Sequence, residues 1–215
     1  MRLILASASP RRRDLLSRLG IPFQVMPPEV AEDAARDGAR LERVARRLAV
    51  AKARAVAARR LDAIILAADT IVAHRRVLLG KPRDPAEAEA MLRALRGRTH
   101  RVVTAVAVLA PGRQRPFLAH AVTRVTMRPY TDEEIAASIA RGDPFDKAGG
   151  YAIQDEVFRP VELYEGCYCN VVGLPLWVAI RLLDKAGLDM TSIGPDDLLP
   201  DCAGCPLATA GLPRL

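Results

Sequence analysis

Long apolar runs are absent from this sequence of 215 residues, although half of its residues are hydrophobic. No stretch of about eighteen consecutive apolar residues occurs, so no membrane-spanning helix is predicted. Residues 1–10 make a poor signal peptide, because arginines follow at once, but a good first strand. We therefore expect one domain with a full hydrophobic core, and a cytoplasmic location in which the four cysteines stay reduced.

Aromatic residues are also scarce, at 4% of the chain, while the formal net charge is +7. The basic residues of segments such as Leu41–Arg60 are mixed with acidic ones and have few aromatic neighbours on which bases would stack. This pattern disfavours nucleic-acid binding as the main role. A small polyanionic substrate explains a local excess of cations equally well.

Lysine is rare as well, since only four of the 32 basic residues are lysines. A lysine offers a compact, flexible ammonium group that a guanidinium cannot replace. Lys52, Lys81 and Lys147 all fall in segments that other features single out, as do Gln154, one of three glutamines, and the single asparagine, Asn170. This scarcity directs attention to these positions.

The most informative stretch is residues 64–82. It begins with an apolar run typical of a buried strand, which Asp69 and Thr70 are expected to interrupt at its carboxyl end. A predicted hairpin then brings Lys81 back beside Asp69. α/β enzymes often place their reactive groups in this way, at the end of a buried strand. Taken alone, the stretch is equally consistent with Asp69 capping a turn and Lys81 lying in solvent.

A second candidate site lies at the start of the first predicted helix, 14–20. Ser9 has the character of an N-cap and Pro10 that of the first helical position. Free backbone N–H groups and the arginines at 11–13 would then point at one place, which favours phosphate binding. The alternative is an ordinary capped helix with a basic first turn.

The remaining pattern predicts alternating strands and helices. The expected strands cover 2–6, 23–26, 100–110 and 117–127, and the further helices 41–60, 85–95, 131–141 and 176–186. His100 is interpreted as a structural residue, because no other histidine lies at metal-site spacing. The acidic loop 27–33 is either solvated surface or a source of metal-binding carboxylates.

The C-terminal residues 190–215 are rich in Gly, Pro and Asp, and we expect them to form a tail outside the core. The tail contains Cys202 and Cys205, and the preceding segment contains Cys167 and Cys169. A four-cysteine zinc site joining tail to body is conceivable, but this spacing is a weak signal. Incidental thiols are therefore the favoured interpretation.

Three separated motifs together resemble the Maf family of nucleoside triphosphate pyrophosphatases. They are Ala6-Ser7-x-Ser9-Pro10-Arg11-Arg12, then Ala68-Asp69-Thr70 with Gly80-Lys81-Pro82, then Lys147-Ala148-Gly149-x-Tyr151-x-Ile153-Gln154 with Asn170-Val171-Val172-Gly173-Leu174-Pro175. The resemblance runs from about residue 2 to 186. Departures from the family pattern are Gly150, where alanine is usual, Asp155, where glycine is common, and the cysteines at 167 and 169.

The resemblance implies an elongated α/β fold, with a mixed β-sheet flanked by helices as in inosine triphosphate pyrophosphatases, over a domain of residues 1–189. It also implies hydrolysis of a nucleoside triphosphate to monophosphate and pyrophosphate with a divalent metal, Mg²⁺ or Mn²⁺. The Asp69-Thr70 pair and Gln154 are similar to the branch acting on dTTP and UTP. A homodimer is plausible from the family.

The resemblance also implies roles for individual residues. Asp69 would be the general base or a metal ligand, with Glu32 as a second metal-binding carboxylate. Arg11, Thr70 and Gln154 match positions tied to substrate choice. The other residues expected to bind substrate are Ser9, Arg12, Lys52, Lys81 and Lys147.

Two alternatives stay open at this point. One is the same chemistry on a modified or purine nucleotide such as 7-methyl-GTP. The other is a non-catalytic regulator of division or a nucleic-acid-binding protein, which would show salt-sensitive DNA binding and no metal-dependent turnover.

Overall fold

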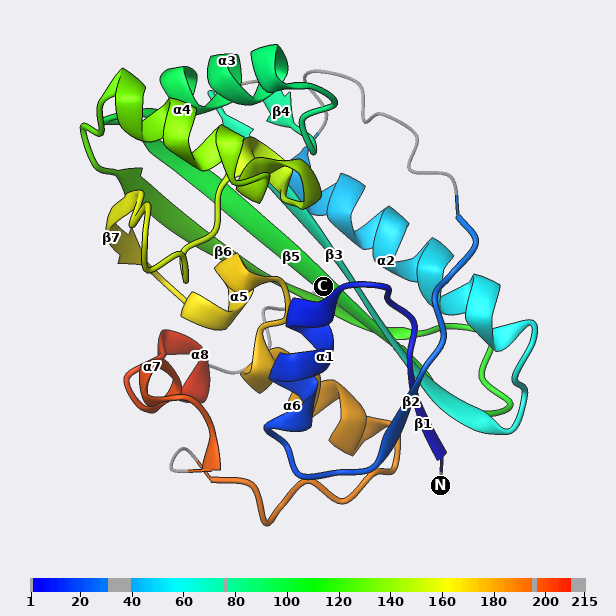
Figure 1. Ribbon diagram of the computed structural model, residues 1–215. Helices are drawn as coiled ribbons and strands as arrows, with labels where there is room; N and C mark the ends of the chain where they lie inside the picture. The colour runs from blue at the N-terminus through cyan, green and yellow to red at the C-terminus, as the bar shows by residue number, and fades with distance from the viewer. Residues whose placement is uncertain (1, 31–39, 76, 195–196, 210–215) are drawn as a thin grey trace.

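The structure is a computed structural model that describes residues 2–30, 40–75, 77–194 and 197–209 (Figure 1). Its centre is a mixed seven-stranded sheet of order β2-β1-β3-β5-β6-β7, with β4 paired to the far end of β3. β1 runs parallel to β2 and β3, and the other pairings are antiparallel. The strands are β1 (Arg2–Leu5), β2 (Phe23–Val25), β3 (Ala63–His74), β4 (Val77–Leu79), β5 (Thr99–Leu109), β6 (Phe117–Met127) and β7 (Val161–Glu165).

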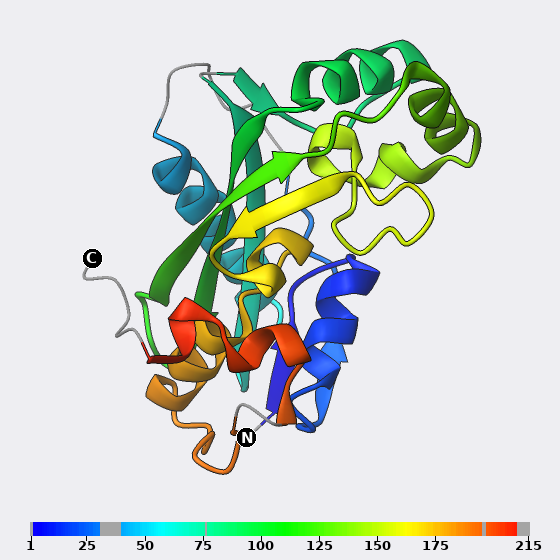
Figure 2. The ribbon, with the colours of Figure 1, turned by 90° about the vertical axis from the view of Figure 1, so that its left-hand side faces the viewer.

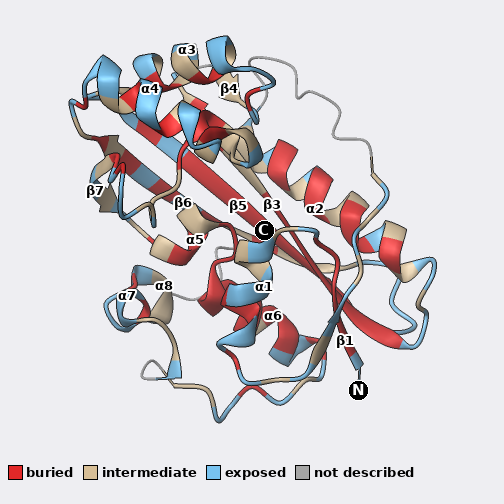
Figure 3. Cartoon of the chain, in the orientation of Figure 1, coloured by how far each residue is buried: buried red, intermediate tan, exposed pale blue. Residues whose placement is uncertain are grey.

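Helices cover both faces of this sheet. The 17-residue helix α2 (Leu41–Ala57) lies along one face, and its small side chains pack on Ile65 and Ala67 of β3. Helices α1 (Pro10–Ser17) and α6 (Leu176–Lys185) pack on the other face. Because side chains alternate along a strand, successive β3 residues belong to different cores. Figure 3 shows buried residues concentrated along the strands and on the inner sides of these helices.

A third cluster lies at the end of the sheet where β4 is found (Figure 2). Helices α3 (Pro85–Leu95) and α4 (Asp132–Ala140) meet there, together with short 3-10 turns η1 (Asp143–Asp146) and η2 (Ala148–Gly150). Both helices begin within one residue of their expected starts, and each has an N-cap. Asp84 accepts from the Glu87 amide of α3, and Thr131 and Glu134 form a capping box in α4.

The structure corrects the expected end of the central strand. Instead of stopping at Asp69, β3 continues to His74 with Asp69 opposite Ala105 and Thr70 opposite Thr104 of β5. The neighbouring strand β1 is the one that ends, since its pairing with β3 stops at Leu5 and Leu66. On the same edge of β3, the pairing with β4 begins only at Val72. Asp69 and Thr70 therefore lie on β3 where its other edge, between Leu66 and Val72, has neither β1 nor β4 beside it.

The C-terminal tail differs from its expected place outside the core. In the described part of the tail, α7 (Pro200–Ala203) and α8 (Pro206–Thr209) lie against the body, and Cys202 and Cys205 belong to the largest hydrophobic cluster. Trp177 Nε1 donates to the Cys202 carbonyl at 3.1 Å, and Arg181 donates to the carbonyls of Leu207 and Ala208. The domain boundary at 189/190 itself stays a prediction.

No helix among the described residues is long and apolar enough to cross a membrane.

Candidate active site

The open edge of β3 carries a buried ion pair. Lys52, on the middle of α2, places its Nζ 2.7 Å from Asp69 Oδ1. The two residues are only 7% and 5% exposed, and both take part in further interactions. Asp69 shares the face of β3 that α2 covers, so the helix that buries this face also supplies the lysine. The expected proximity of Asp69 and Lys52 is thus present.

Thr70, the next residue, points to the opposite face of the sheet and meets α1 there. Arg12 donates from Nη2 to Thr70 Oγ1 at 3.1 Å and from Nε to the Gly173 carbonyl at 2.9 Å. Gly173 has a φ of 125°, and a Cβ at this position would lie 3.4 Å from both Arg12 Nε and Thr70 Oγ1. Glycine is therefore required where the arginine and the threonine come together.

The direction of the hydrogen bonds at Thr70 is determined by its neighbours. Arg12 can only donate, and the hydroxyl of Thr104, 2.9 Å from that of Thr70, donates its own hydrogen to the Asn170 carbonyl at 2.8 Å. Thr70 must then donate to Thr104. With one hydrogen given and one accepted, the Thr70 oxygen can only accept from any further partner.

Asn170, the single asparagine, anchors this chain of hydroxyls from a fully buried position on α5 (Tyr168–Val172). Its side chain accepts from the Thr104 amide at 3.0 Å and donates to the Val102 carbonyl and to Thr123 Oγ1. Sequence analysis identified Asn170 but missed Thr104. The signal was a lone hydroxyl within the apolar run of β5.

The predicted N-cap at Ser9 is confirmed. Its hydroxyl accepts from the Arg12 amide at 3.4 Å, with Pro10 at the first position of α1. The Ser9 amide in turn donates to the hydroxyl of Ser7, a residue only 4% exposed. The first turn of α1 contains no acidic residue, so no side chain of that turn neutralises its arginines.

Arg11 and Lys147 meet at a carboxylate that sequence analysis did not single out, Asp146. Arg11 Nη1 lies 2.6 Å from Asp146 Oδ2, and Lys147 Nζ contacts Oδ1 of the same group. Burial raises the pKa of Asp146, but hydrogen bonds from Lys147 and Arg11 outweigh this and leave the pKa below its usual range. The carboxylate thus stays charged and holds the two cations together from positions 136 residues apart.

Comparisons with known proteins show the family to which the chain belongs. The family model described as Maf-like protein matches residues 2–186. The chain belongs to the Maf family. It is 58% identical to a protein of Thermomicrobium roseum named dTTP/UTP pyrophosphatase, over 98% of this chain and 95% of that protein. A protein of Moorella thermoacetica with the same name is 49% identical, over 88% of this chain and 97% of its own length.

The Maf match confirms the expected fold class. The T. roseum alignment also extends into the tail, since it covers 98% of the chain. A solved nucleoside-triphosphatase, dITP/XTP pyrophosphatase, from Mycobacterium abscessus superposes with a TM-score of 0.40 and 15% identity over 90% of this chain and 100% of that one. That superposition is too loose to support an argument.

Two other predicted site residues of this Maf protein, Lys81 and Gln154, are exposed. Lys81 is exposed in the loop after β4, which is held to η2 by a hydrogen bond from the Gly149 amide to the Gly80 carbonyl at 2.9 Å. Gln154 is exposed in a turn after η2. Glu32 lies outside the described residues.

The predicted divalent metal depends on Asp69 and Glu32. Among the described residues, no group of three or more His, Cys, Asp and Glu side chains has a geometry that could hold a metal ion. A magnesium ion that arrives with phosphates needs only one or two protein carboxylates, so Asp69 is a chemically suitable ligand. The metal itself stays a prediction.

Two surface hollows lie away from these residues. One is lined by Ile180, Arg181 and Met190 beside α6, and the other by Arg40, Glu42 and Arg46 at the start of α2. Among the described residues, neither hollow is lined by a predicted site residue.

Proposed function

We propose that this Maf protein hydrolyses dTTP and UTP to the monophosphate and pyrophosphate. The observation that carries the proposal is the buried carboxylate of Asp69 on the open edge of β3, with Lys52 on one face and Arg12 beside the next residue on the other. The names of the similar proteins from T. roseum and M. thermoacetica support the same substrates.

In the proposed reaction, a water oxygen bonds to phosphorus and the bridging bond between the α- and β-phosphates breaks. Asp69 orients the water and takes its proton, while Lys52 holds the carboxylate in place. A triphosphate carries about four negative charges, so Arg12 and the Arg11–Lys147 corner would bind it through charge-assisted hydrogen bonds. A bound Mg²⁺ or Mn²⁺, held by Asp69 and Glu32, would supply further neutralisation of phosphate charge.

The hydrogen-bond pattern at Thr70 bears on base choice. Because its hydroxyl already donates to Thr104, it offers only an acceptor to a ligand. Uracil and thymine carry an N3–H donor, whereas N3 of cytosine is an acceptor. If Thr70 faces N3 of the base, dTTP and UTP are accepted and CTP is rejected, because two facing acceptors leave each other unpaired.

A panel of nucleotides tests the proposal. Hydrolysis of dTTP, UTP, CTP, dCTP, GTP, inosine triphosphate and 7-methyl-GTP would be followed by release of pyrophosphate with Mg²⁺ and with Mn²⁺. We expect dTTP and UTP to have the highest kcat/KM. Preference for 7-methyl-GTP would overturn the assigned substrate but keep the chemistry, whereas no turnover together with salt-sensitive DNA binding would overturn the enzyme assignment.

Asp69→Asn should reduce kcat by about 10³-fold or more while the protein stays folded, because the amide oxygen can still accept from Lys52. The dependence of residual activity on metal concentration separates two roles. Unchanged half-saturation indicates a base, and a large shift indicates a metal ligand. Near-full turnover of this variant would remove Asp69 from the mechanism.

The homodimer and the cytoplasmic location stay proposals that rest on the family resemblance and on the composition of the chain.

A further inference from the structure

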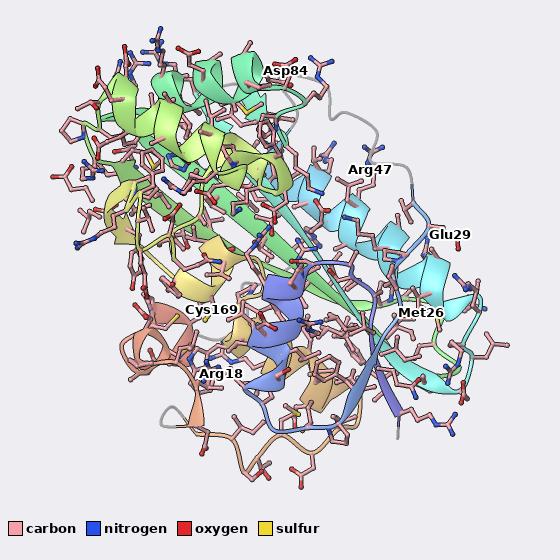
Figure 4. All side chains as sticks on the ribbon, in the orientation of Figure 1. Arg18, Met26, Glu29, Arg47, Asp84 and Cys169 are labelled. Atoms are coloured by element: carbon pink, nitrogen blue, oxygen red, sulfur yellow. The ribbon has the colours of Figure 1, made fainter. Side chains whose placement is uncertain are left out.

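All four cysteines of the chain lie in one buried cluster between body and tail. Cys167 and Cys169 are at the start of α5, Cys202 is in α7, and Cys205 precedes α8. Their exposed fractions are only 2%, 0%, 1% and 5%, respectively. Figure 4 labels Cys169 on α5, near the tail helices. The cluster therefore joins segments more than thirty residues apart.

The sulfur atoms form a continuous chain of contacts. Cys169 Sγ lies 3.3 Å from Cys202 Sγ. Cys167 interacts through its side chain with both Cys169 and Cys205. Each body cysteine thus meets one tail cysteine, and the two body cysteines meet each other. Incidental thiols scattered in a core have no reason to converge in this way.

Four thiols that converge in a buried place offer a set of ligands that suits a structural metal ion.

We propose that Cys167, Cys169, Cys202 and Cys205 bind one Zn²⁺ ion in a tetrahedral all-thiolate site that fastens the tail to the body. Four Zn–S bonds form as four thiols release their protons to solvent, which leaves the site with a net charge of two negative units. Four cysteine ligands are typical of structural zinc sites. This proposal is independent of the nucleotide chemistry.

The thiols do not yet have the geometry of a metal site, as no described group of such ligands does. Zn–S bonds of about 2.3 Å place neighbouring sulfurs of a tetrahedron about 3.8 Å apart. The Cys169–Cys202 distance of 3.3 Å would therefore open by about half an ångström, which rotation of the Cα–Cβ bonds can supply. A disulfide instead requires closure to about 2.05 Å and an oxidant.

The first test is metal content. The full chain would be purified under reducing conditions without chelator, and zinc and protein measured by mass spectrometry. We expect one zinc per chain, released in step with the reaction of four thiols with a mercurial reagent. Replacement by Co²⁺ should give the intense thiolate-to-cobalt charge-transfer band and the visible bands of a tetrahedral cobalt site.

Variants then assign the ligands. Cys169→Ser and Cys202→Ser should each weaken zinc binding at least tenfold in a chelator competition. Met190→Leu changes another buried sulfur-containing residue of the same hydrophobic cluster and should leave zinc binding unchanged. Zinc should also protect the tail of the unaltered chain from protease, and a chelator should remove that protection, which keeps the proposal testable if a serine variant fails to fold.

Two results would overturn the proposal. One is a reduced, folded chain that binds less than a tenth of an equivalent of zinc or cobalt and shows four free thiols. The other is a freshly purified chain whose mass lacks two hydrogens for each of two bonds between body and tail cysteines, which would make the cluster a pair of disulfides.

Discussion

Two carboxylates in this protein are each paired with lysine or arginine side chains, yet their surroundings are opposite. Asp69 lies in the middle of β3 under α2 and meets Lys52 with both side chains less than 10% exposed. Asp146 lies on the surface turn η1 with 58% of its side chain exposed and meets Arg11 and Lys147. The distances are similar, at 2.7 and 2.6 Å, so distance alone does not distinguish the pairs.

Burial does distinguish them. An exposed pair is screened by water and contributes about 0–1 kcal/mol. A buried pair interacts more strongly but is desolvated at a cost that often exceeds the gain, so an apolar core would serve stability equally well. The comparison suggests that Lys52 and Asp69 are retained for their chemistry, while the Asp146 corner gathers cations at little energetic consequence.

The largest expected effect comes from removing one partner of the buried Lys52–Asp69 pair. Lys52→Met should lower the free energy of unfolding by about 3 kcal/mol, because Asp69 loses its ammonium partner in a buried place. Lys52→Met combined with Asp69→Leu should recover most of that stability while activity stays absent. Urea unfolding and pyrophosphate release would be measured on the same preparations.

Lys185→Met is the matched control, because Lys185 is exposed at the end of α6. It should change stability by less than about 0.5 kcal/mol. A double variant as unstable as the single one would show that the pair itself stabilises the fold, contrary to the argument from burial.

The same contrast between buried and more exposed charged groups can be tested with histidines. His100 on β5 is 2% exposed, its Nε2 lies 2.6 Å from the Tyr151 hydroxyl, and burial lowers its pKa to about 4. The unfolded chain, with a pKa near 6.5, binds the proton first, so stability is lost as pH falls from about 6.5 to about 4. The loss from this group should approach about 3 kcal/mol and then level off.

Denaturant unfolding between pH 7 and pH 4 measures this dependence. His100→Gln should remove that part of the slope, whatever its effect at neutral pH. His120→Gln, at a half-buried position on β6, should leave most of the slope in place. An unchanged slope in His100→Gln would indicate that other groups control the acid stability.

The sequence predicts the helices and strands well where the apolar residues recur at one regular spacing. The helices expected at 41–60, 85–95 and 131–141 are present, because the signals that predict them act locally. The sequence predicts too early an end for β3, because polar residues inside an apolar run are typical of the end of a strand. Whether a strand continues depends on its neighbours, and here it was β1 that ended.

The sequence identifies several residues of the candidate site but does not predict the contacts between them. The family motifs identified Asp69, Thr70 and Arg12, yet alternation along β3 puts Asp69 and Thr70 on opposite faces of the sheet. Asp146 and Thr104 were missed because each acts through a partner more than thirty residues away. The loop-like composition of the tail predicts a place outside the core, and the four cysteines that bring it to the body give only a weak signal in the sequence.

The smallest expected effect belongs to the exposed corner. Asp146→Asn keeps the backbone carbonyl that accepts from Arg11 at 3.0 Å but removes the charge between two cations. Stability should change by less than about 1 kcal/mol. KM for dTTP should fall by about two- to fivefold at low salt, because an anion near the triphosphate is gone, with kcat unchanged. The effect should shrink as ionic strength rises.

Asp143→Asn makes the same change of charge three residues earlier, at a carboxylate paired with Arg141 and not with Arg11. It should leave KM nearly unchanged. Equal effects of the two variants would mean that overall charge attracts the nucleotide, so that the corner has no particular role. If Asp146→Asn lowered the free energy of unfolding as much as Lys52→Met, exposure would not explain the difference between the two carboxylates. Breaking a solvated ion pair would then cost as much stability as we expect for breaking the buried one.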